Sequence, residues 1–236
     1  MAEISLCMAV YNGEKFIEKQ LKSILKQTIV PNEIIISDDG STDNTVNLIK
    51  ATLPTAKIII NPLKGIVSNF ENALKHSTGK YIFLSDQDDE WQQNKIEKIM
   101  PLFAQYPLII HDAEIIDESS QPITTDSFFQ LRNSKSGIIN NLIKSTYLGC
   151  CMAFTRTVLE KALPFPKNIE MHDRWLGLIG EISGGAYFYP EKLIGYRRHG
   201  KNASGGFNKS KYGKLKQLSI RTYMAKELIK RYLSTK

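Results

Sequence analysis

Short apolar runs alternate with amphipathic segments along the first half of the chain. Residues 4–10 form an almost entirely apolar run that predicts a buried strand, and residues 14–28 place apolar side chains at helical spacing. The same succession predicts further strands at 33–37, 57–60, 80–85 and from 108 to 111, and further helices at 46–53, 66–76 and 94–104. Strands and helices that alternate at this spacing predict an α/β fold, with a mostly parallel sheet flanked by helices.

The pattern loosens beyond residue 113. A polar stretch at 117–136 precedes an apolar segment at 149–154, and two more helices are expected near 156–162 and 174–182. This region predicts short strands mixed with loops. We therefore divide the chain into residues 1–113, residues 114–207 as the second half of the same domain, and a tail at 208–236.

The tail differs from the rest of the chain in charge. The formal net charge is +7, and residues 208–236 alone hold nine Lys or Arg against one Glu, so the preceding residues are nearly neutral. Apolar residues of the tail, among them Leu218, Met224 and Leu228, fall largely on one side of a helix. Such a helix can lie on an anionic membrane surface or dock on the body with a solvated basic face. Nucleic acid is the weakest of the three alternatives, and we expect no such partner.

Composition and the cysteines narrow the class of protein. Hydrophobic residues make up 42% and charged residues 23% of the chain, which is ordinary for a globular protein. No apolar run approaches the roughly 20 residues of a membrane span, and the N-terminus lacks the features of a secretory signal. We expect a cytoplasmic protein, at most peripheral at the inner membrane face. Cys7, Cys150 and Cys151 fit no disulfide framework and no zinc-binding spacing, so reduced, packed thiols are expected.

An acidic run follows the predicted strand at 80–85. Asp86, Asp88, Asp89 and Glu90 lie within five positions and offer only hard oxygen ligands. Such a donor set favours Mg²⁺ or Mn²⁺ over zinc. The alternative is an acidic turn whose side chains cap the helix that begins near Gln93, and the run alone leaves both open.

Polar residues stand at the carboxyl ends of all the predicted parallel strands, where open α/β sheets bind their ligands. An acid at a strand end, as in Asp38-Asp39-Gly40-Ser41, can accept hydrogen bonds from a pyrimidine ring or from ribose hydroxyls. Asp-Gly-Ser is also a common turn, so this alternative stays open. Neither Gly-x-Gly-x-x-Gly nor a Gly-Lys-Ser/Thr phosphate loop occurs, which disfavours two frequent modes of nucleotide binding.

Four segments in order form a more specific pattern. They are Val10-Tyr11-Asn12-Gly13, then Leu21-x-x-x-Leu25-x-Gln27-Thr28, then the segment from Glu33 to Asp43, and then Leu84-Ser-Asp-Gln-Asp-Asp-Glu-Trp. Together they resemble glycosyltransferase family 2 over about residues 3 to 205. The resemblance implies a GT-A (Rossmann-like) fold, a nucleotide-sugar donor, a divalent metal, Mg²⁺ or Mn²⁺, and inversion at the anomeric carbon.

The resemblance also implies roles for individual residues. Asp39, with Tyr11 and Asp38, would hold the nucleoside, and Ala9 stands where many members carry a hydroxyl residue. Asp86-Gln87-Asp88 matches the Asp-x-Asp element of the family, with Asp86 on the donor side and Asp88 as the metal ligand. The segment from Tyr196 to Ser204 resembles an element of rhamnosyltransferase-like members, in which Arg197 and Arg198 would bind the diphosphate and His199 the metal.

The remaining implied roles concern the acceptor. Within His172-Asp173-Arg174-Trp175, which resembles a Glu-Asp or His-Asp element of the family, Asp173 would be the catalytic base. A carboxylate can accept the proton of an acceptor hydroxyl, and the alternative is that Asp173 caps the following helix. Four residues are assigned to the acceptor side: Cys150, Cys151, His172 and Trp175.

These inferences define an expected reaction. The Gln-x-x-Arg-Trp element of processive synthases is absent, which favours transfer of a single sugar. We expect a metal-dependent inverting transfer from dTDP-rhamnose or a UDP-sugar to a saccharide or lipid-linked acceptor in cell-surface polysaccharide synthesis. In this reading residues 1–113 bind the nucleotide sugar and residues 114–207 the acceptor. The alternatives are a sugar-phosphate nucleotidylyltransferase and a non-catalytic nucleotide-sugar-binding module.

Overall fold

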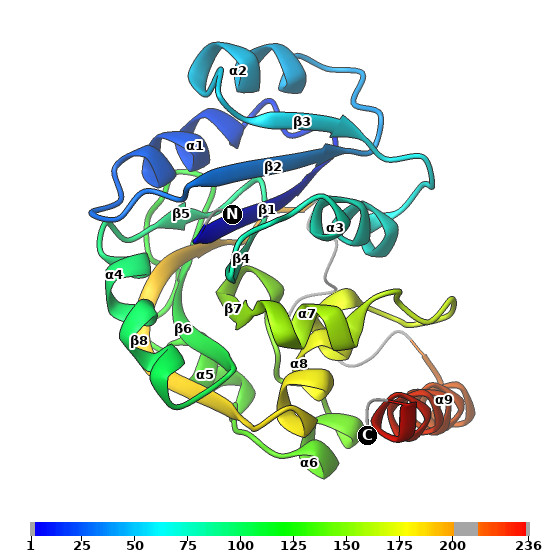
Figure 1. Ribbon diagram of the computed structural model, residues 1–236. Helices are drawn as coiled ribbons and strands as arrows, with labels where there is room; N and C mark the ends of the chain where they lie inside the picture. Colours follow the sequence, from blue (N-terminus) through cyan, green and yellow to red (C-terminus); the bar gives the residue numbers. More distant parts are fainter. Residues whose placement is uncertain (1–2, 201–211, 235–236) are drawn as a thin grey trace.

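A single mixed sheet organises the protein. The computed structural model describes residues 3–200 and 212–234. Over these residues the sheet has eight strands in the order β3-β2-β1-β4-β7-β6-β8-β5 (Figure 1). The strands are β1 (Ile4–Val10), β2 (Glu33–Asp38), β3 (Lys57–Ile60), β4 (Tyr81–Ser85), β5 (Glu90–Trp91), β6 (Leu108–Ile116), β7 (Met152–Thr155) and β8 (Ala186–Arg197).

The first half of the chain forms the parallel part of this sheet. β1 pairs in parallel with β2 and with β4, and β2 pairs in parallel with β3. All seven residues of β1 are buried, because helices cover both faces. α1 (Ile17–Leu25) and α2 (Thr45–Thr52) pack on each other, whereas α3 (Ile66–Lys75) packs against β1 and β2 from the other face. These strands and helices confirm the predicted α/β pattern.

The second half extends the sheet with mixed directions. β7 runs antiparallel between β4 and β6, β8 pairs in parallel with β6, and β5 is antiparallel to β8 at the edge. The chain therefore leaves the middle of the sheet at the end of β4 and reaches the far edge at β5 within a few residues. Residues 86–89, which make this crossing, are thereby brought beside the end of β8.

Two strands and two short helices of this half differ from the sequence-based expectation. The 12-residue β8 is the longest strand described, yet Pro190, Glu191 and Lys192 interrupt its apolar pattern. β5 has only two residues and depends on pairing with β8. The helices α5 (Phe128–Arg132) and α6 (Ile138–Ile143) lie in the region expected to be loops.

The other helices lie close to where they were expected. The helix expected at 94–104 divides into α4 (Lys95–Ile99) and a 3-10 segment, η1 (Met100–Ala104), because Pro101 cannot donate a helical hydrogen bond. A short 3-10 segment, η2 (Gly149–Cys151), precedes β7. The last helices are α7 (Arg156–Ala162), α8 (His172–Ile182) and α9 (Lys214–Ser234).

The basic tail docks on the body through one face of α9. Met224 and Leu228 are buried, and α9 contacts α6 and α8. The docked-helix interpretation of the tail is therefore correct for this inner face. None of the helices in the described part of the chain combines the length and the apolar character needed to cross a membrane.

Candidate active site

Three loops at the carboxyl end of the parallel strands are tied together by side-chain hydrogen bonds. The side chain of Gln87 accepts from the backbone N–H of Tyr11 at 2.9 Å and donates to its carbonyl at 3.0 Å. Asn12, at a left-handed φ of 45°, accepts from the N–H of Thr42 at 2.8 Å, and its own N–H donates to Ser41 at 3.0 Å. Strands β2 and β3 are added on one side of β1, whereas β4 is added on the other side. Open α/β sheets bind ligands at the point where the strand order reverses in this way.

The two acids expected at the nucleoside have different environments. Asp38 is buried and accepts from the N–H and the hydroxyl of Ser41, so it closes the turn after β2. Asp39 is only half-buried and accepts from Asn61 at 2.7 Å and from the N–H of Gly65 at 3.0 Å. Asp39 is therefore the acid of this pair that remains partly accessible.

The two other residues expected at the nucleoside lie on and next to β1. Ala9 is buried near the end of the strand, whereas Tyr11, in the loop that follows, is 53% exposed. Of the two, only the Tyr11 side chain is open to a ligand at the rim of the site.

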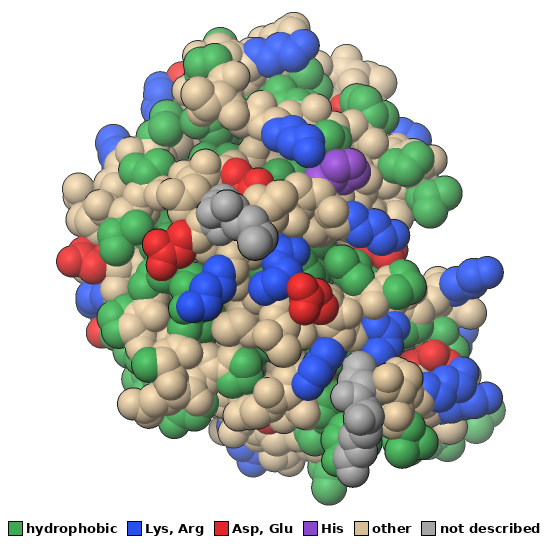
Figure 2. All heavy atoms as spheres, viewed as in Figure 1, with side chains coloured by type: hydrophobic (Ala, Val, Ile, Leu, Met, Phe, Trp, Pro, Cys, Tyr) green, Lys and Arg blue, Asp and Glu red, His purple; other side chains and the backbone are tan. Residues whose placement is uncertain are grey.

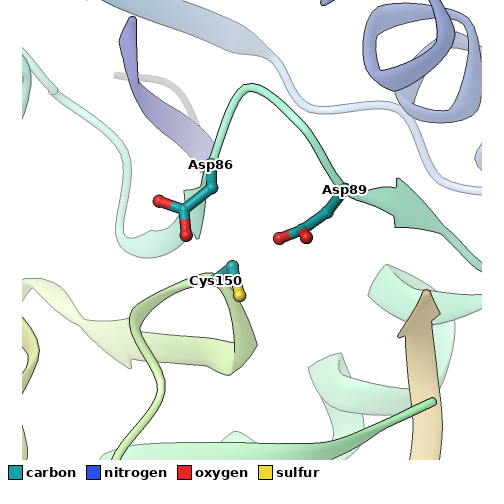
Figure 3. A group of neighbouring side chains, drawn as sticks. All are labelled: Asp86, Asp89 and Cys150. Carbon is teal, nitrogen blue, oxygen red and sulfur yellow. The ribbon is translucent and has the colours of Figure 1, made fainter. Parts of the chain in front are cut away.

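The acidic loop, residues 86–89, crosses above Cys150 of η2. One potential ligand atom from each of Asp86, Asp89 and Cys150 lies within 4.8 Å of the others. Figure 3 shows both carboxylates directed toward the same space, with the thiol below them. Asp89 is buried, and its Oδ2 has no hydrogen-bond partner among the described residues. A buried carboxylate oxygen without a donor carries a desolvation cost, which the nearby charge of Lys95 offsets only in part.

The negative charges of neighbouring carboxylates in this loop make ionisation of Asp86 and Asp89 less favourable. Burial, followed by the charges of Asp89, Asp88 and Asp173, raises the pKa of Asp86 well above its usual value. Burial and the charge of Asp88 raise the pKa of Asp89 to about 7. Burial also raises the pKa of the Cys150 thiol, so the sulfur stays protonated at neutral pH. A bound cation would relieve the repulsion between the carboxylates.

Asp88 and His199, the two expected metal ligands, lie next to each other. His199 Nε2 is 2.7 Å from Asp88 Oδ2, and the imidazole packs on Phe16 with ring centroids 5.0 Å apart. The Asp88 side chain is 14% exposed and that of His199 is 10% exposed, whereas Asp89 is 1% exposed. A divalent cation that keeps water and phosphate in its shell needs ligands that solvent can reach. The donor set of this loop therefore fits a hard cation on its Asp88 side.

Arg197 shapes the acidic loop from within the protein. Its guanidinium is fully buried and donates to the carbonyls of Asp88 at 2.8 Å and Asp117 at 2.5 Å, to Ser120 at 3.2 Å, and to the carboxylate of Glu90. Its backbone N–H donates to Asp89 Oδ1 at 3.0 Å. The family resemblance implied that Arg197 binds the diphosphate of the donor. In the structure its guanidinium instead donates to acceptors of the protein.

Arg198 differs from Arg197 in exposure. Its side chain is half-buried, its guanidinium lies over the ring of Tyr196, and it donates to the hydroxyl of Tyr196 at 3.1 Å. Arg198 is thus the arginine of this pair nearer to solvent. The rest of the donor-rich segment, residues 201–204, lies outside the described residues.

Asp173 stands in the first turn of α8, close enough to the acidic loop for its charge to raise the pKa of Asp86. Its carboxylate accepts from the N–H of Arg174 at 2.6 Å, and burial raises its pKa to about 6. The N-cap position of α8 belongs to Met171, so the alternative in which Asp173 is the N-cap does not describe this helix. A carboxyl group with a pKa near neutrality suits general-base chemistry.

His172 and Gly149 form the wall beside Asp173. The imidazole of His172 stacks on Phe70 with centroids 3.9 Å apart, and burial lowers its pKa to about 3, so it is neutral. Both ring nitrogens are buried without a partner among the described residues. A Cβ at Gly149 would lie 2.8 Å from His172 Nε2 and 3.5 Å from Asp173 Cβ, so only glycine allows this approach.

Two residues assigned to the acceptor side belong to the core instead. Trp175 is 0% exposed, and its indole N–H donates to the carbonyl of Ala162 at 2.9 Å. Cys151 is also fully buried, next to Cys150. On α8, His172 stacks on Phe70 beside Gly149, whereas Trp175 packs against α7 through its bond to Ala162.

Two residues near the site, Gln87 and Lys95, were given no role from the sequence, whereas Asp89 was already part of the acidic run offered as metal ligands. Gln87 links two loops. Lys95 is fully buried, donates to the carbonyl of Cys150 at 2.9 Å, and lies over the ring of Trp91. Burial lowers its pKa to about 8, and its charge partly offsets those of Asp86 and Asp89. The role of Lys95 follows from its burial under the acidic loop, and the sequence does not show burial.

Known proteins are similar to this chain in sequence. The chain is 30% identical over 236 residues to the dTDP-rhamnosyl transferase RfbG of Shigella flexneri, covering 90% of this chain and 78% of that protein. It is 29% identical to the UDP-Glc:alpha-D-GlcNAc-diphosphoundecaprenol beta-1,3-glucosyltransferase WfgD of Escherichia coli, covering 75% of this chain and 69% of that protein.

A solved structure shares the fold. The 1–349 fragment of Staphylococcus aureus TarS, in complex with UDP-GlcNAc, superposes with a TM-score of 0.69 at 15% identity, over 95% of this chain and 66% of that one. The chain thus spans about two thirds to four fifths of the length of these proteins.

The fold and the site define a glycosyltransferase domain of the GT-A type. The chain belongs to glycosyl transferase family 2, whose sequence model matches residues 5–163. This confirms the family, the fold class and the nucleotide-sugar class of enzyme inferred from the motifs.

Proposed function

We propose that the protein is a metal-dependent, inverting glycosyltransferase that moves one sugar from a nucleotide-sugar donor to a saccharide or lipid-linked acceptor. The observation that carries this proposal is the meeting of three elements at one edge of the sheet. The acidic loop after β4, His199 after β8, and Asp173 at the start of α8 come together there. Each element comes from a different part of the chain, which argues against a simple acidic turn.

The donor would lie along the loops after β1, β2 and β4. Asp39 is the accessible acid after β2 and would accept hydrogen bonds from the nucleoside, beside the exposed ring of Tyr11. Arg198 would bind the diphosphate, since an arginine near solvent can fork onto phosphate oxygens.

Asp88 and His199 would hold Mg²⁺ or Mn²⁺, with Asp86 beside them. A cation bound there would neutralise the charge that develops on the departing diphosphate. Asp86, Asp89 and Cys150 form a second candidate ligand set, but the protonated thiol and the buried Asp89 are less suited to an ion that shares its shell with substrate.

Asp173 would act as the base. Its carboxylate accepts the proton of the acceptor hydroxyl while the acceptor oxygen bonds to the anomeric carbon. The bond from that carbon to the diphosphate oxygen breaks, and the nucleoside diphosphate leaves with the electron pair. Attack from the face opposite the leaving group inverts the anomeric carbon. The pKa of about 6 places the carboxylate in its active, ionised form at neutral pH.

The names of the relatives suggest substrates. RfbG is a dTDP-rhamnosyl transferase, and WfgD transfers glucose from a UDP donor to a diphosphoundecaprenol-linked sugar. We therefore propose dTDP-rhamnose or a UDP-sugar as donor, and an acceptor of cell-surface polysaccharide synthesis that is presented at the inner membrane face. Residues 1–113 would bind the donor and residues 114–207 the acceptor.

Thermal-shift measurements with dTDP-rhamnose, UDP-glucose, UDP-galactose and UDP-GlcNAc, with Mn²⁺ or with a chelator, test the donor site. A ligand that binds only the folded state raises the melting temperature. We expect one donor to raise it only with Mn²⁺, and Asp88→Asn to abolish the effect. Asp126→Asn, an exposed acid outside the site, is the matched control. If Asp89→Asn abolishes the shift and Asp88→Asn does not, the cation lies on the buried side of the loop. If no donor shifts the protein, the proposal fails.

A further inference from the structure

α9 carries two apolar stripes, of which only one faces the protein. Met224 and Leu228 of the inner stripe are buried, and Arg231 donates to the carbonyls of Lys161 and Leu163 at 2.6 and 2.8 Å. The guanidinium of Arg231 also lies over the ring of Trp175. These contacts fix the orientation of α9 on the body and leave its opposite side outward.

The outer stripe consists of large aliphatic side chains in water. Their exposed fractions are 86% for Leu215, 59% for Leu218, 60% for Ile229 and 66% for Leu233. At the rotation of an α-helix these four positions fall within about 60° of one another. Leu215 and Leu218 also line an open groove along the helix. α6, which contacts α9, exposes Ile139 at 73%. The stripe thus has two apolar ends, Leu215 with Leu218 and Ile229 with Leu233, about 16 Å apart along the helix axis with Thr222 and Ala225 between them. Large apolar side chains exposed together on one helix face mark an interaction site.

Basic side chains border the outer stripe on both sides. By helical spacing, Lys226 and Lys230 lie along one border, and Lys214 and Arg221 along the other. α9 contains six basic residues and one acidic residue, Glu227, for a net charge of +5. In Figure 2 the region at the lower right, where Figure 1 places α9, shows hydrophobic and basic side chains side by side.

We propose that the outer stripe of α9 seats the protein on a lipid surface that carries anionic headgroups. Leucine and isoleucine would enter the boundary between headgroups and acyl chains, to a depth of about 5–10 Å, while the bordering lysines meet the headgroup charge. The chemistry of the face argues for this occupant over two others. A second copy would bring two surfaces of charge +5 together, and nucleic acid would leave the four aliphatic side chains in water.

Attachment through α9 would place the body in a defined orientation. α9 contacts α8, whose first turn carries Asp173, so the lipid-facing helix and the wall of the candidate site belong to neighbouring elements. The helix would lie in the interface without crossing it. The proposal rests on the surface of α9 alone and does not depend on the reaction proposed for the site.

Sedimentation with vesicles tests this proposal with the full chain. The vesicles contain phosphatidylcholine alone or with about 30% phosphatidylglycerol, which supplies the anionic charge. We expect binding to the anionic vesicles to be at least about tenfold stronger than to the neutral ones. The variant Leu215→Ser, Leu218→Ser, Ile229→Ser, Leu233→Ser should lose at least about tenfold in binding at an unchanged melting temperature, because the replaced side chains contribute to insertion and not to the core.

Two controls separate insertion from general surface effects. Ile29→Ser with Val30→Ser removes exposed apolar side chains from a loop elsewhere, and Lys50→Gln with Lys57→Gln removes exposed charges elsewhere; both should bind like the wild type. Equal binding by the four-serine variant and the wild type would overturn the proposal. It would also be overturned if neither protein bound vesicles and the wild type instead formed a dimer that the variant lost, or retained single-stranded DNA in a salt-dependent manner.

Discussion

Replacing Arg197 by methionine tests whether this side chain is a structural element or a ligand for the donor. Methionine keeps the length of the side chain but has neither charge nor donors. In the wild type the guanidinium is 0% exposed and serves the carbonyls of Asp88 and Asp117 together with Glu90. Both carbonyls would lose a charged donor, while the carboxylate of Glu90, whose side chain is 32% exposed, can regain water.

The magnitude follows from these contacts. A buried acceptor that loses its partner costs about 1–3 kcal/mol, so two carbonyls give about 2–6 kcal/mol. We therefore expect Arg197→Met to lower the free energy of unfolding by about 4 kcal/mol. For a chain of this length that corresponds to a fall in melting temperature of about 8–16 °C.

Urea and thermal unfolding of the purified variant measure this loss, with Arg198→Met as the matched control. Arg198 is half-buried and bonded to the hydroxyl of Tyr196, so its replacement should cost no more than about 1 kcal/mol while weakening donor binding. A loss below about 1 kcal/mol for Arg197→Met, together with a loss of donor affinity, would show that the guanidinium faces the ligand and would refute the reasoning.

Three further predictions concern the acceptor side. Asp173→Asn should reduce kcat by about 10²–10⁴, and the wild-type rate should fall below about pH 6, the pKa of the base, in a pH–rate profile. The folded-state pKa of Asp173 is raised from 3.8 to about 6, so between these pH values the native state binds more protons than the unfolded state, and stability falls as pH rises. At pH 8, Asp173→Asn should therefore have a free energy of unfolding about 1–3 kcal/mol higher than that of the wild type. An equal or lower stability would contradict this. Gly149→Ala should lower kcat with a small change in melting temperature, since its Cβ would displace His172; normal turnover would contradict this close approach. Trp175→Phe should lower the free energy of unfolding by about 1–3 kcal/mol and leave the KM for the acceptor unchanged. A raised KM would indicate that Trp175 contacts the acceptor.

The parallel half of the fold could be predicted because its signals are local. β1, at 4–10, coincides with the predicted strand, and the acids after β2 and β4 follow apolar runs directly. In a parallel sheet, carboxyl ends at one edge follow from the alternation of strands and helices, so the gathering of Asp39 and Asp86 could be inferred before the structure was known. The family motifs lie in this half, at the start of α8 and after β8. They named Asp88 and His199, which are in contact, and Asp173, whose charge reaches Asp86.

The sequence by itself thus determined the α/β class, the family, the edge of the sheet that carries the site and the types of residue available there, because apolar periodicity and short motifs act over neighbouring positions. The tertiary structure decided which of these side chains are accessible. β8 and β5 pair across about a hundred residues, and that pairing buries Arg197 under the acidic loop. Packing of α7 and α9 on α8 turns Trp175 into the core, and packing of α4 places Lys95 beneath Asp86 and Asp89. Burial and pKa depend on these distant contacts, so they are properties of the folded chain.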